Sequence, residues 1–318
     1  MHSANTELSS IIRYIRNAAE LSQSEFADRV GVTRLTVTRW ENGVSVPNTI
    51  AQTRLYEIAQ KNGTELFDLI LSDLPERGMN DGKVILYHGS KTGMIGPIGP
   101  KSREFCDFGK GFYMGTCAHQ PLTMLFSSER GGTEACLYVV EFDLKGLKVM
   151  YVPNGIDWIL LVAYSRGKMR EFEGSALYEK YRSMLSGYDV AVGKIADDRL
   201  FTAIDSFFDG NISEKGALEC MSALQLGDQY VALTEKACGQ IRILERRDLS
   251  ELERLCIYDV SERNRESGIT TTNRIRRTYR RIGRYFDEIM KGENENPEDN
   301  RRSGRYFDEI MKGGDKNA

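Results

Sequence analysis

The sequence predicts a multidomain protein in which a small all-α domain precedes a larger α+β domain. At 318 residues, the chain is too long for one ordinary hydrophobic core and suits two. Apolar residues recur at helical spacing through residues 1–72, whereas short β-rich runs and interspersed helical stretches follow in irregular order from residue 83. Residues 73–82 contain Pro75, Gly78 and Gly82, which is typical of a linker.

The composition is that of a globular protein and limits the kinds of partner. Hydrophobic residues make up 41% and charged residues 28% of the chain, and the formal net charge is -3. Any contact with nucleic acid must therefore come from a local face. The six cysteines include no CxxC pair and are accompanied by three histidines, so we expect no metal. Because no apolar run could span a bilayer, we expect a cytoplasmic protein with no membrane contact.

The helices of the first domain are predicted from apolar spacing and from their end signals. Residues 8–19 form the first helix. Ser22 opens a capping box for a second helix, which ends at Gly31. Thr33 caps a third helix that ends at the Asn-Gly pair of residues 42–43. Two short helices joined by a tight glycine turn indicate a helix-turn-helix.

The segment LSQSEFADRVGVTRLTVTRWENG resembles the lambda-repressor and Cro (XRE-like) type of DNA-binding domain, over about residues 8–72. The resemblance implies five helices and double-stranded DNA as partner, and we expect a homodimer on a palindromic site. The residues that it places on base edges in the major groove are Arg34, Leu35, Thr38 and Arg39. It places Gln23 and Asn42 on phosphates.

A second interpretation of the first domain is a module for dimerisation or protein docking. Residues 1–72 contain seven lysines and arginines against eight acidic residues. Such a neutral domain should bind DNA of unrelated sequence only weakly.

Strands are expected throughout the second domain, which we place at residues 83–260. The predicted strands are residues 84–87, 137–142, 147–151, 190–195, 229–233 and 241–244, with helices at 156–164 and 214–224. No GxGxxG follows the first strand, so a Rossmann fold has little support.

Residues 261–318 are predicted to form a basic tail that is partly helical or disordered. Its segment 274–284 holds six arginines and no acid, and we favour a solvated face over a contact with phosphate or with an acidic partner. The segment GRYFDEIMKG is present at 283–292 and again at 304–313. Each copy is compatible with a short amphipathic helix that docks on a partner.

Three segments of the second domain carry residues suited to chemistry. His88 lies in LYHGS at the end of an apolar strand, Tyr113 lies in DFGKGFYMGT between glycines, and Gln229 opens the strand of LGDQYVALTE. Each segment alone is weak, since a lone histidine at a strand end is more often structural. Their presence together in one domain favours a ligand site.

The three segments resemble the poly(ADP-ribose) polymerase and diphtheria-toxin branch of the ADP-ribosyltransferases, in particular the bacterial toxin-associated domain of the DUF3990 type, over residues 83–245. The resemblance implies a split antiparallel β-sandwich with helices and NAD as substrate. It implies that His88 binds a ribose hydroxyl, that the Gly89 backbone holds the nicotinamide amide and that Ser90 holds the adenosine ribose. Tyr113 would stack on the nicotinamide, and Gly111 and Thr116 complete the expected cofactor-binding set.

The sequence departs from that family where the polymerases carry a glutamate, because Gln229 stands there. A glutamine can hold a hydroxyl but cannot act as a general base. Single ADP-ribose transfer, NAD hydrolysis and binding alone remain as alternatives, with Asp228 or Glu235 as sources of a carboxylate. Thr116, Gln120 and Met124 stand near the positions where a second tyrosine and a serine usually complete the nicotinamide pocket.

The functional hypothesis is a DNA-binding protein with an NAD-dependent mono-ADP-ribosyltransferase-like domain, acting as a toxin-antitoxin or defence effector that modifies a macromolecule. An antitoxin or a protein acceptor is then a candidate partner. The alternatives are a transcription regulator whose inactive transferase-like domain senses NAD or a related nucleotide, and a tethering protein that uses the tail.

Overall fold

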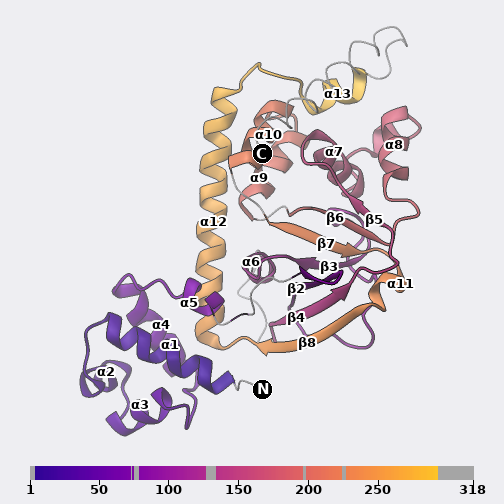
Figure 1. Cartoon of the computed structure of the whole chain (residues 1–318). Helices are drawn as coiled ribbons and strands as arrows, with labels where there is room; N and C mark the ends of the chain where they lie inside the picture. Colours follow the sequence, from indigo (N-terminus) through magenta and orange to yellow (C-terminus); the bar gives the residue numbers. More distant parts are fainter. Residues whose placement is uncertain are drawn as a thin grey trace.

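The computed structural model describes residues 4–72, 74, 79–126, 134–195, 198–223 and 227–292. Five helices form the N-terminal part, and an α+β region with a mixed sheet follows (Figure 1), so the predicted fold class is confirmed. The five helices are α1 (Ala4–Ala18), α2 (Gln23–Val30), α3 (Arg34–Glu41), α4 (Thr49–Lys61) and α5 (Phe67–Ser72).

The helix ends of the N-terminal domain form for the predicted local reasons. The Ser22 side chain accepts from the backbone of Glu25, whose carboxylate accepts from the Ser22 backbone, so the capping box before α2 is present. Gly31 ends α2 with a φ of 80°, and Thr33 caps α3. The fully buried side chains of this core include Ile11, Ile12, Ile15, Phe26, Val37 and Leu55.

The sheet has eight strands in the order β5-β6-β7-β3-β2-β4-β8, with β1 paired to β2. The strands are β1 (Met79–Asn80), β2 (Lys83–Ser90), β3 (Phe112–Gly115), β4 (Cys136–Asp143), β5 (Val149–Tyr151), β6 (Val190–Lys194), β7 (Asp228–Ala232) and β8 (Ile241–Asp248). Only β5 and β6 are parallel. All six predicted strands are present. Asp81 and Gly82 have positive φ in the turn between β1 and β2, so the last residues of the predicted linker belong to this hairpin.

The two central strands β2 and β3 pair at a single position, Tyr87 with Gly115. In contrast, β2 pairs with β4 along its whole length, and β3 pairs with β7 at all four of its residues. The expected split sandwich is therefore one continuous sheet in which β2 and β3 are joined at one position only.

Helices cover the sheet and enclose its main core. They are α6 (His119–Leu125), α7 (Ile156–Ser165), α8 (Ala176–Met184), α9 (Asp198–Phe208), α10 (Glu214–Ala223), α11 (Glu235–Cys238), α12 (Glu251–Thr278) and α13 (Phe286–Gly292). Trp158 of α7 is fully buried, and its Nε1 donates to the backbone oxygen of Lys194 at 2.9 Å. This bond ties the helical layer to β6. No helix in the described part of the chain is long and apolar enough to cross a membrane.

The long helix α12 corrects the predicted boundary at residue 260. It runs without interruption through residues 251–278, and Val260 and Ser261 on either side of the expected boundary are both buried. It contacts α9 and α10 of the second domain and α4 and α5 of the first. Residues 261–278 are therefore part of the folded protein, because one helix face is covered on both sides of the boundary.

The N-terminal domain docks on α12 through polar contacts as well as a shared apolar cluster. The Tyr56 hydroxyl donates to Asp259, and Gln52 accepts from the backbone of Leu252 at 3.1 Å. Arg247 forms a 2.6 Å ion pair with Glu253, and both side chains are buried. The apolar cluster runs without a break from α1–α5 through α6 and β4 to α12.

The first copy of the repeated segment forms the predicted amphipathic helix, α13, but it docks on its own chain. Phe286, Ile289 and Met290 are buried. The Phe286 ring lies 5.6 Å from the rings of both Phe207 and Phe208, centroid to centroid. The second copy, at 304–313, lies outside the described residues.

Candidate functional site

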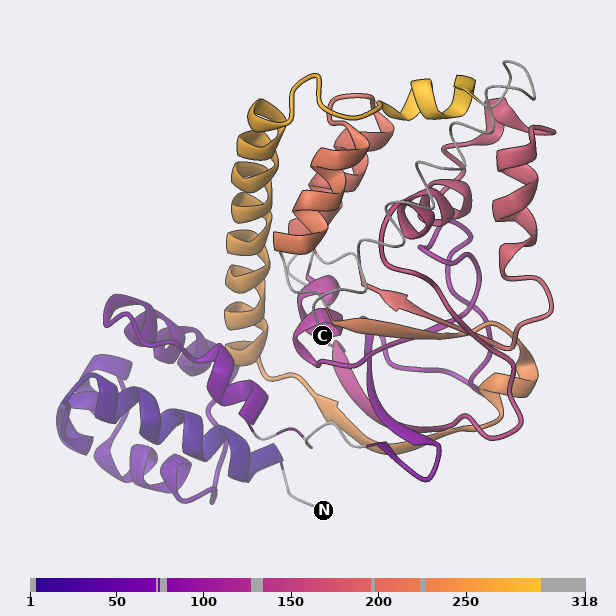
Figure 2. The same ribbon diagram turned by 45° about the horizontal axis from the view of Figure 1, so that its top comes forward.

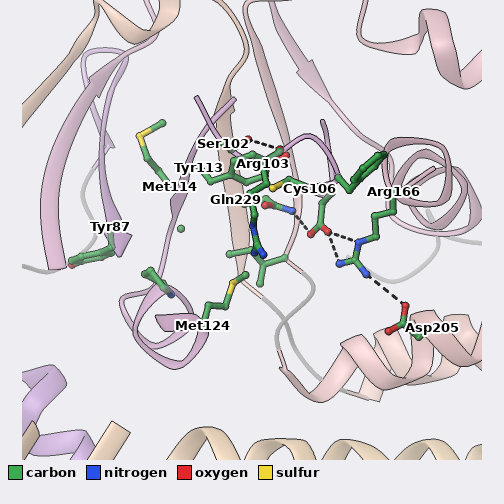
Figure 3. Close-up of a pocket in the computed structure, with 15 residues that line it drawn as sticks. Tyr87, Ser102, Arg103, Cys106, Tyr113, Met114, Met124, Arg166, Asp205 and Gln229 are labelled. Atoms are coloured by element: carbon green, nitrogen blue, oxygen red, sulfur yellow. Dashed lines mark hydrogen bonds and ion pairs between the residues drawn. The ribbon is translucent and has the colours of Figure 1, made fainter. Parts of the chain in front are cut away.

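A cavity of about 520 Å³ opens between the centre of the sheet and the helical layer. Strands β2, β3 and β7, the loop before β3, and helices α6 and α9 all contribute to its wall (Figure 3). The lining side chains that carry the argument are Tyr87, Arg103, Asp107, Tyr113, Arg166 and Gln229. The cavity has the size of an ordinary small-molecule site.

Strand register brings together Tyr113 and Gln229, two of the three residues predicted to carry the chemistry. Gly115 pairs with Tyr87 on one side and with Gln229 on the other, and Tyr113 is two residues before Gly115. Paired residues and residues two apart share one face of a sheet. Tyr87, Tyr113 and Gln229 therefore all face the cavity.

His88 lies on the opposite face, next in sequence to the cavity residue Tyr87. Its ring stacks on Phe112, with centroids 4.3 Å apart, and its Nδ1 donates to the backbone oxygen of Tyr113 at 2.7 Å. Burial lowers the pKa of His88, which favours the neutral ring. With the proton on Nδ1, Nε2 is a hydrogen-bond acceptor.

Tyr113 is held in place by its own loop. Its hydroxyl donates to the backbone oxygen of Gly109 at 2.8 Å and accepts from the Phe108 backbone at 2.9 Å. Burial raises the pKa of Tyr113, so the phenol stays protonated. Both bonds fix the ring as a rigid, flat part of the cavity wall.

An ion pair that no sequence motif indicates lies inside the cavity. Arg166, at the end of α7, donates to Asp107 Oδ1 from Nη2 at 2.7 Å and from Nε at 3.2 Å. Arg166 also lies 3.9 Å from a carboxylate oxygen of Asp205 on α9. Asp107 is the first residue of the segment DFGKGFYMGT, but its partner is 59 positions away in the chain. Only the tertiary structure joins them.

Asp107 explains the glutamine at position 229. The Gln229 amide nitrogen donates to Asp107 Oδ2 at 3.2 Å and to the Lys194 backbone oxygen at 2.9 Å. Both N–H groups are used, so the amide oxygen is left to accept a hydrogen bond. A glutamate here would bring a second carboxylate against two acceptors. The carboxylate beside this position is therefore Asp107.

The two carboxylates predicted as substitutes lie away from the cavity wall. Asp228 forms a 2.8 Å ion pair with Lys194, and Glu235 begins α11 near Gly99. Thr116 is buried and accepts from the backbone of Asp228 at 3.1 Å, so it joins β3 to β7.

The predicted glycines are explained by close packing. A Cβ on Gly89 would lie 2.7 Å from the Pro121 backbone oxygen of α6, and one on Gly111 would lie 2.4 Å from Val231. Ser90 pairs with Cys136 at the end of β2. Of these three predicted ligand residues, none lines the cavity in the described structure.

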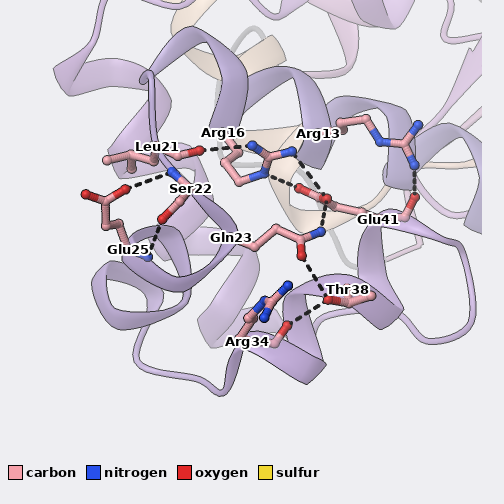
Figure 4. Close-up of polar contacts among 9 residues, drawn as sticks. All are labelled: Arg13, Arg16, Leu21, Ser22, Gln23, Glu25, Arg34, Thr38 and Glu41. Atoms are coloured by element: carbon pink, nitrogen blue, oxygen red, sulfur yellow. Dashed lines mark hydrogen bonds and ion pairs between the residues drawn. The ribbon is translucent and has the colours of Figure 1, made fainter.

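Five of the six predicted DNA-binding residues lie on α3 or at its C-cap, and the sixth, Gln23, is the first residue of α2. Figure 4 shows Gln23 beside Arg34 and Thr38. Arg34, Arg39 and Asn42 are exposed, and Leu35 is 59% exposed. Helix α3 lies on the side of the domain away from α12 (Figure 1 and Figure 2). The α3 surface is therefore accessible to a partner.

Gln23 is used inside the domain. Its amide oxygen accepts from Thr38 at 3.1 Å, and its nitrogen donates to Glu41 at 2.8 Å. Glu41 is buried and also pairs with Arg16 at 2.6 Å. This network sets the angle between α2 and α3, and it positions Thr38 beside the exposed residues of α3.

The fold and these two sites define a two-domain protein with an N-terminal helix-turn-helix that supports DNA binding and an α+β domain with an internal cavity. Residues 12–69 match the family model described as Helix-turn-helix. Residues 84–243, half of the chain, match the family described as Protein of unknown function (DUF3990), and the chain belongs to this family. No curated protein and no solved structure matches the chain.

Proposed function

We propose that the protein binds DNA through α3 and that its α+β domain transfers one ADP-ribose from NAD to a macromolecule, as a bacterial toxin-antitoxin or defence effector. The observation that carries the proposal is the cavity wall shared by Tyr113, Gln229 and Asp107, with His88 next in sequence to the cavity residue Tyr87 on β2. An aromatic plane, two hydrogen-bond acceptors and a carboxylate suit a nucleotide with ribose hydroxyls.

Each side chain has a role that its contacts support. Nε2 of neutral His88 accepts from a ribose hydroxyl, and the anchored Tyr113 ring stacks on the nicotinamide. The Gln229 amide oxygen accepts from the second ribose. Arg103 lines the cavity, has no ion-pair partner among the described residues, and supplies positive charge for the pyrophosphate.

The proposed reaction breaks the bond between nicotinamide and ribose and releases nicotinamide. An oxygen or nitrogen of the acceptor then bonds to the ribose carbon and loses its proton. Because Asp107 is the nearest carboxylate to Gln229, it is placed to stabilise positive charge that develops on the ribose. Gln229 cannot take the proton itself, which favours a single transfer over chain building.

The test incubates the full-length protein with a cell lysate and NAD labelled on its adenylate part. Free nicotinamide and label on macromolecules are both measured. We expect both signals, and we expect His88→Ala to abolish them while His2→Ala, the matched control, keeps them. Nicotinamide release without transferred label would indicate hydrolysis in place of transfer. The absence of both signals would refute the enzymatic proposal.

A second candidate, a transcription regulator that senses NAD or a related nucleotide, is favoured by the position of α6. Pro121 and Met124 of this helix line the cavity. On its other side, the Thr123 backbone oxygen accepts from Ser261 of α12 at 3.2 Å, and the His119 ring meets Phe67 of α5 edge-on at 5.2 Å. A ligand that moves α6 would therefore disturb the support of the DNA-binding domain.

The sensor is tested by measuring the affinity of the protein for its DNA with and without NAD. A change in affinity that is lost in Met124→Ala would support it. Unchanged DNA affinity at saturating NAD would rule it out.

A further inference from the structure

A second hollow lies at the far end of α12, away from the DNA-binding domain. Its volume is about 480 Å³, and its lining residues are Gly210, Asn211, Arg276, Arg277, Arg280 and Tyr285. We call it the arginine hollow. The turn between α9 and α10, the C-terminal end of α12 and the start of the α13 segment meet there. None of its lining residues lines the cavity described above.

The positive charge of the arginine hollow is not neutralised by the described parts of the chain. Arg276, Arg277 and Arg280 are exposed, and none has an ion-pair partner among the described residues. The neighbouring acids already have partners. Glu214 pairs with Arg284 at 3.3 Å, Asp287 pairs with Lys291 at 3.3 Å, Asp209 lies 3.8 Å from Lys168, and Glu288 accepts from the Tyr285 backbone at 2.8 Å.

Helix stability accounts for only part of this charge. Cations in the last turn of a helix interact favourably with its dipole, and Arg276 and Arg277 are in the last turn of α12. Arg280 lies beyond the C-cap residue Tyr279, where the dipole no longer explains it. Nor does the dipole explain why the three guanidinium groups line one concave surface.

The rigid side of the hollow carries aromatic and amide groups. Tyr285 directly precedes buried Phe286, which holds the start of α13 in the core. Asn211 follows Gly210, whose φ is 70°, and its backbone donates to Ser206 at 2.8 Å. Both side chains are therefore presented from fixed backbone.

We propose that the arginine hollow binds the phosphate chain of a free nucleoside polyphosphate. Planar guanidinium groups bind phosphate oxygens in pairs, so three of them suit several adjacent phosphates. Tyr285 provides a ring for stacking against the base, and Asn211 provides an amide for its polar edge. The site does not depend on the reaction proposed for the cavity.

The position of the hollow places it near that cavity. Asp205 of α9 lines the cavity, and Gly210 follows in the turn that begins after the last residue of this helix, Phe208. A nucleotide in the hollow would thus lie next to the cavity without entering it.

The test measures binding of ATP and of inorganic tripolyphosphate to the full-length protein by calorimetry, with NAD added as a competitor. We expect both probes to bind and NAD not to displace tripolyphosphate. The variant Arg276→Gln/Arg277→Gln/Arg280→Gln should lower the affinity for both probes by about tenfold or more, as expected for lost hydrogen bonds to charged groups. The control Lys61→Gln/Arg182→Gln/Arg242→Gln removes the same charge from other exposed positions and should bind like the parent.

Further variants separate the base from the phosphates and guard against a folding defect. Tyr285→Ala should weaken the binding of ATP but leave the binding of tripolyphosphate unchanged. Tyr285→Phe should bind both probes like the parent. If the triple variant melts at a lower temperature than the parent, Arg280→Gln alone replaces it, since Arg280 lies outside α12.

Three results would overturn the proposal. The first is equal affinity of the parent and the arginine variant. The second is displacement of tripolyphosphate by NAD, which would place the phosphate in the cavity. The third is tighter, arginine-dependent binding of a single-stranded oligonucleotide than of ATP, which would make the ligand a nucleic-acid strand. A chain without NAD activity could still pass all three tests, so the two proposals fail separately.

Discussion

At the scale of single residues, the pair Asp107 and Gln229 determines what the cavity can do. The amide nitrogen of Gln229 faces two acceptors, Asp107 Oδ2 and the Lys194 backbone oxygen. A carboxylate at position 229 would meet like charge in a site where Gln229 is only 3% exposed. The two acceptors therefore favour glutamine, whose amide nitrogen donates to both of them.

We predict that Gln229→Glu does not create a more active enzyme but destabilises the fold by about 1 to 3 kcal/mol, the usual cost of a buried group without a partner. Asp107→Asn combined with Gln229→Glu restores a donor for the carboxylate at position 229 and should recover part of the loss, because the Lys194 backbone oxygen still faces that position and Arg166 no longer meets the Asp107 carboxylate. Chemical denaturation of the parent, both single variants and the double variant measures the coupling. Additive losses in the double variant would contradict it.

The shifted pKa of His88 gives a second prediction at this scale. Burial lowers its pKa in the folded protein below the ordinary histidine value of 6.5, so the unfolded chain binds the proton more readily. The free energy of unfolding should therefore fall as the pH drops through 6.5 towards the folded pKa. In His88→Gln this fall should be smaller, as measured by denaturation between pH 7.5 and pH 5 at about 0.5 unit steps. Identical pH profiles would show that His88 does not titrate differently in the two states.

At the scale of secondary structure elements, local signals predicted the helices of the first domain well. The caps at Ser22, Gly31 and Thr33 act within one helical turn, so sequence alone contains them. The register that joins Tyr113 and Gln229, and the pair of Asp107 with Arg166, depend on partners far apart in the chain. No local pattern encodes such distances, so the sequence singled out Tyr113 and Gln229, which line the cavity, but neither Arg166 nor the placement of His88 on the opposite face.

The length of α12 was missed for a related reason. Its C-terminal half contains Gly268 and a run of threonines, which have low helix propensity. Gly268 and Thr272 are buried against neighbouring helices, and this packing outweighs propensity. The arginines of residues 274–281 are exposed, as their pattern predicted, whereas Arg284 pairs with Glu214.

The prediction that belongs to helix α3 concerns its exposed arginines. Arg34→Ala and Arg39→Ala should each weaken specific DNA binding by about 1 to 3 kcal/mol, the usual value of a bidentate base contact. Lys61→Ala, at the C-terminal end of α4, serves as the control and should bind DNA with the affinity of the parent. Equal DNA affinity of parent and both variants, in a titration at fixed salt, would refute the assignment of α3 as the base-contacting helix.

At the scale of the whole molecule, α12 connects every functional region. The DNA-binding domain packs on its first half (Figure 1). Helix α6, which lines the cavity, contacts α12 at Ser261, and the arginine hollow lies at the C-terminal end of α12. A helix buried along one face transmits displacement as a rigid body more readily than a flexible linker does. The two domains therefore behave as one folded unit with α3 directed outward.

The junction of the two domains contains one buried and one exposed ion pair, which allows a matched comparison. Arg247 and Glu253 are 4% and 7% exposed, whereas Arg263 and Glu65 are 57% and 68% exposed. Removing one partner of a buried pair leaves an uncompensated charge, so Glu253→Ala should lower the free energy of unfolding by about 3 to 5 kcal/mol. Glu65→Ala should cost less than about 1 kcal/mol, because water solvates the remaining arginine.

Hydrogen exchange of α4 and α5 shows whether the loss of stability in Glu253→Ala is local to the junction of the two domains. In Glu253→Ala the backbone amides of both helices should exchange faster, because Arg247 also donates to the Ile70 backbone oxygen at 3.5 Å and Gln52 is bonded to the start of α12. The paired substitution Arg247→Met/Glu253→Leu removes both charges and should restore slow exchange. If Glu65→Ala and Glu253→Ala had equal effects, or if exchange in α4 and α5 stayed unchanged, the two domains would be held together by the apolar cluster alone.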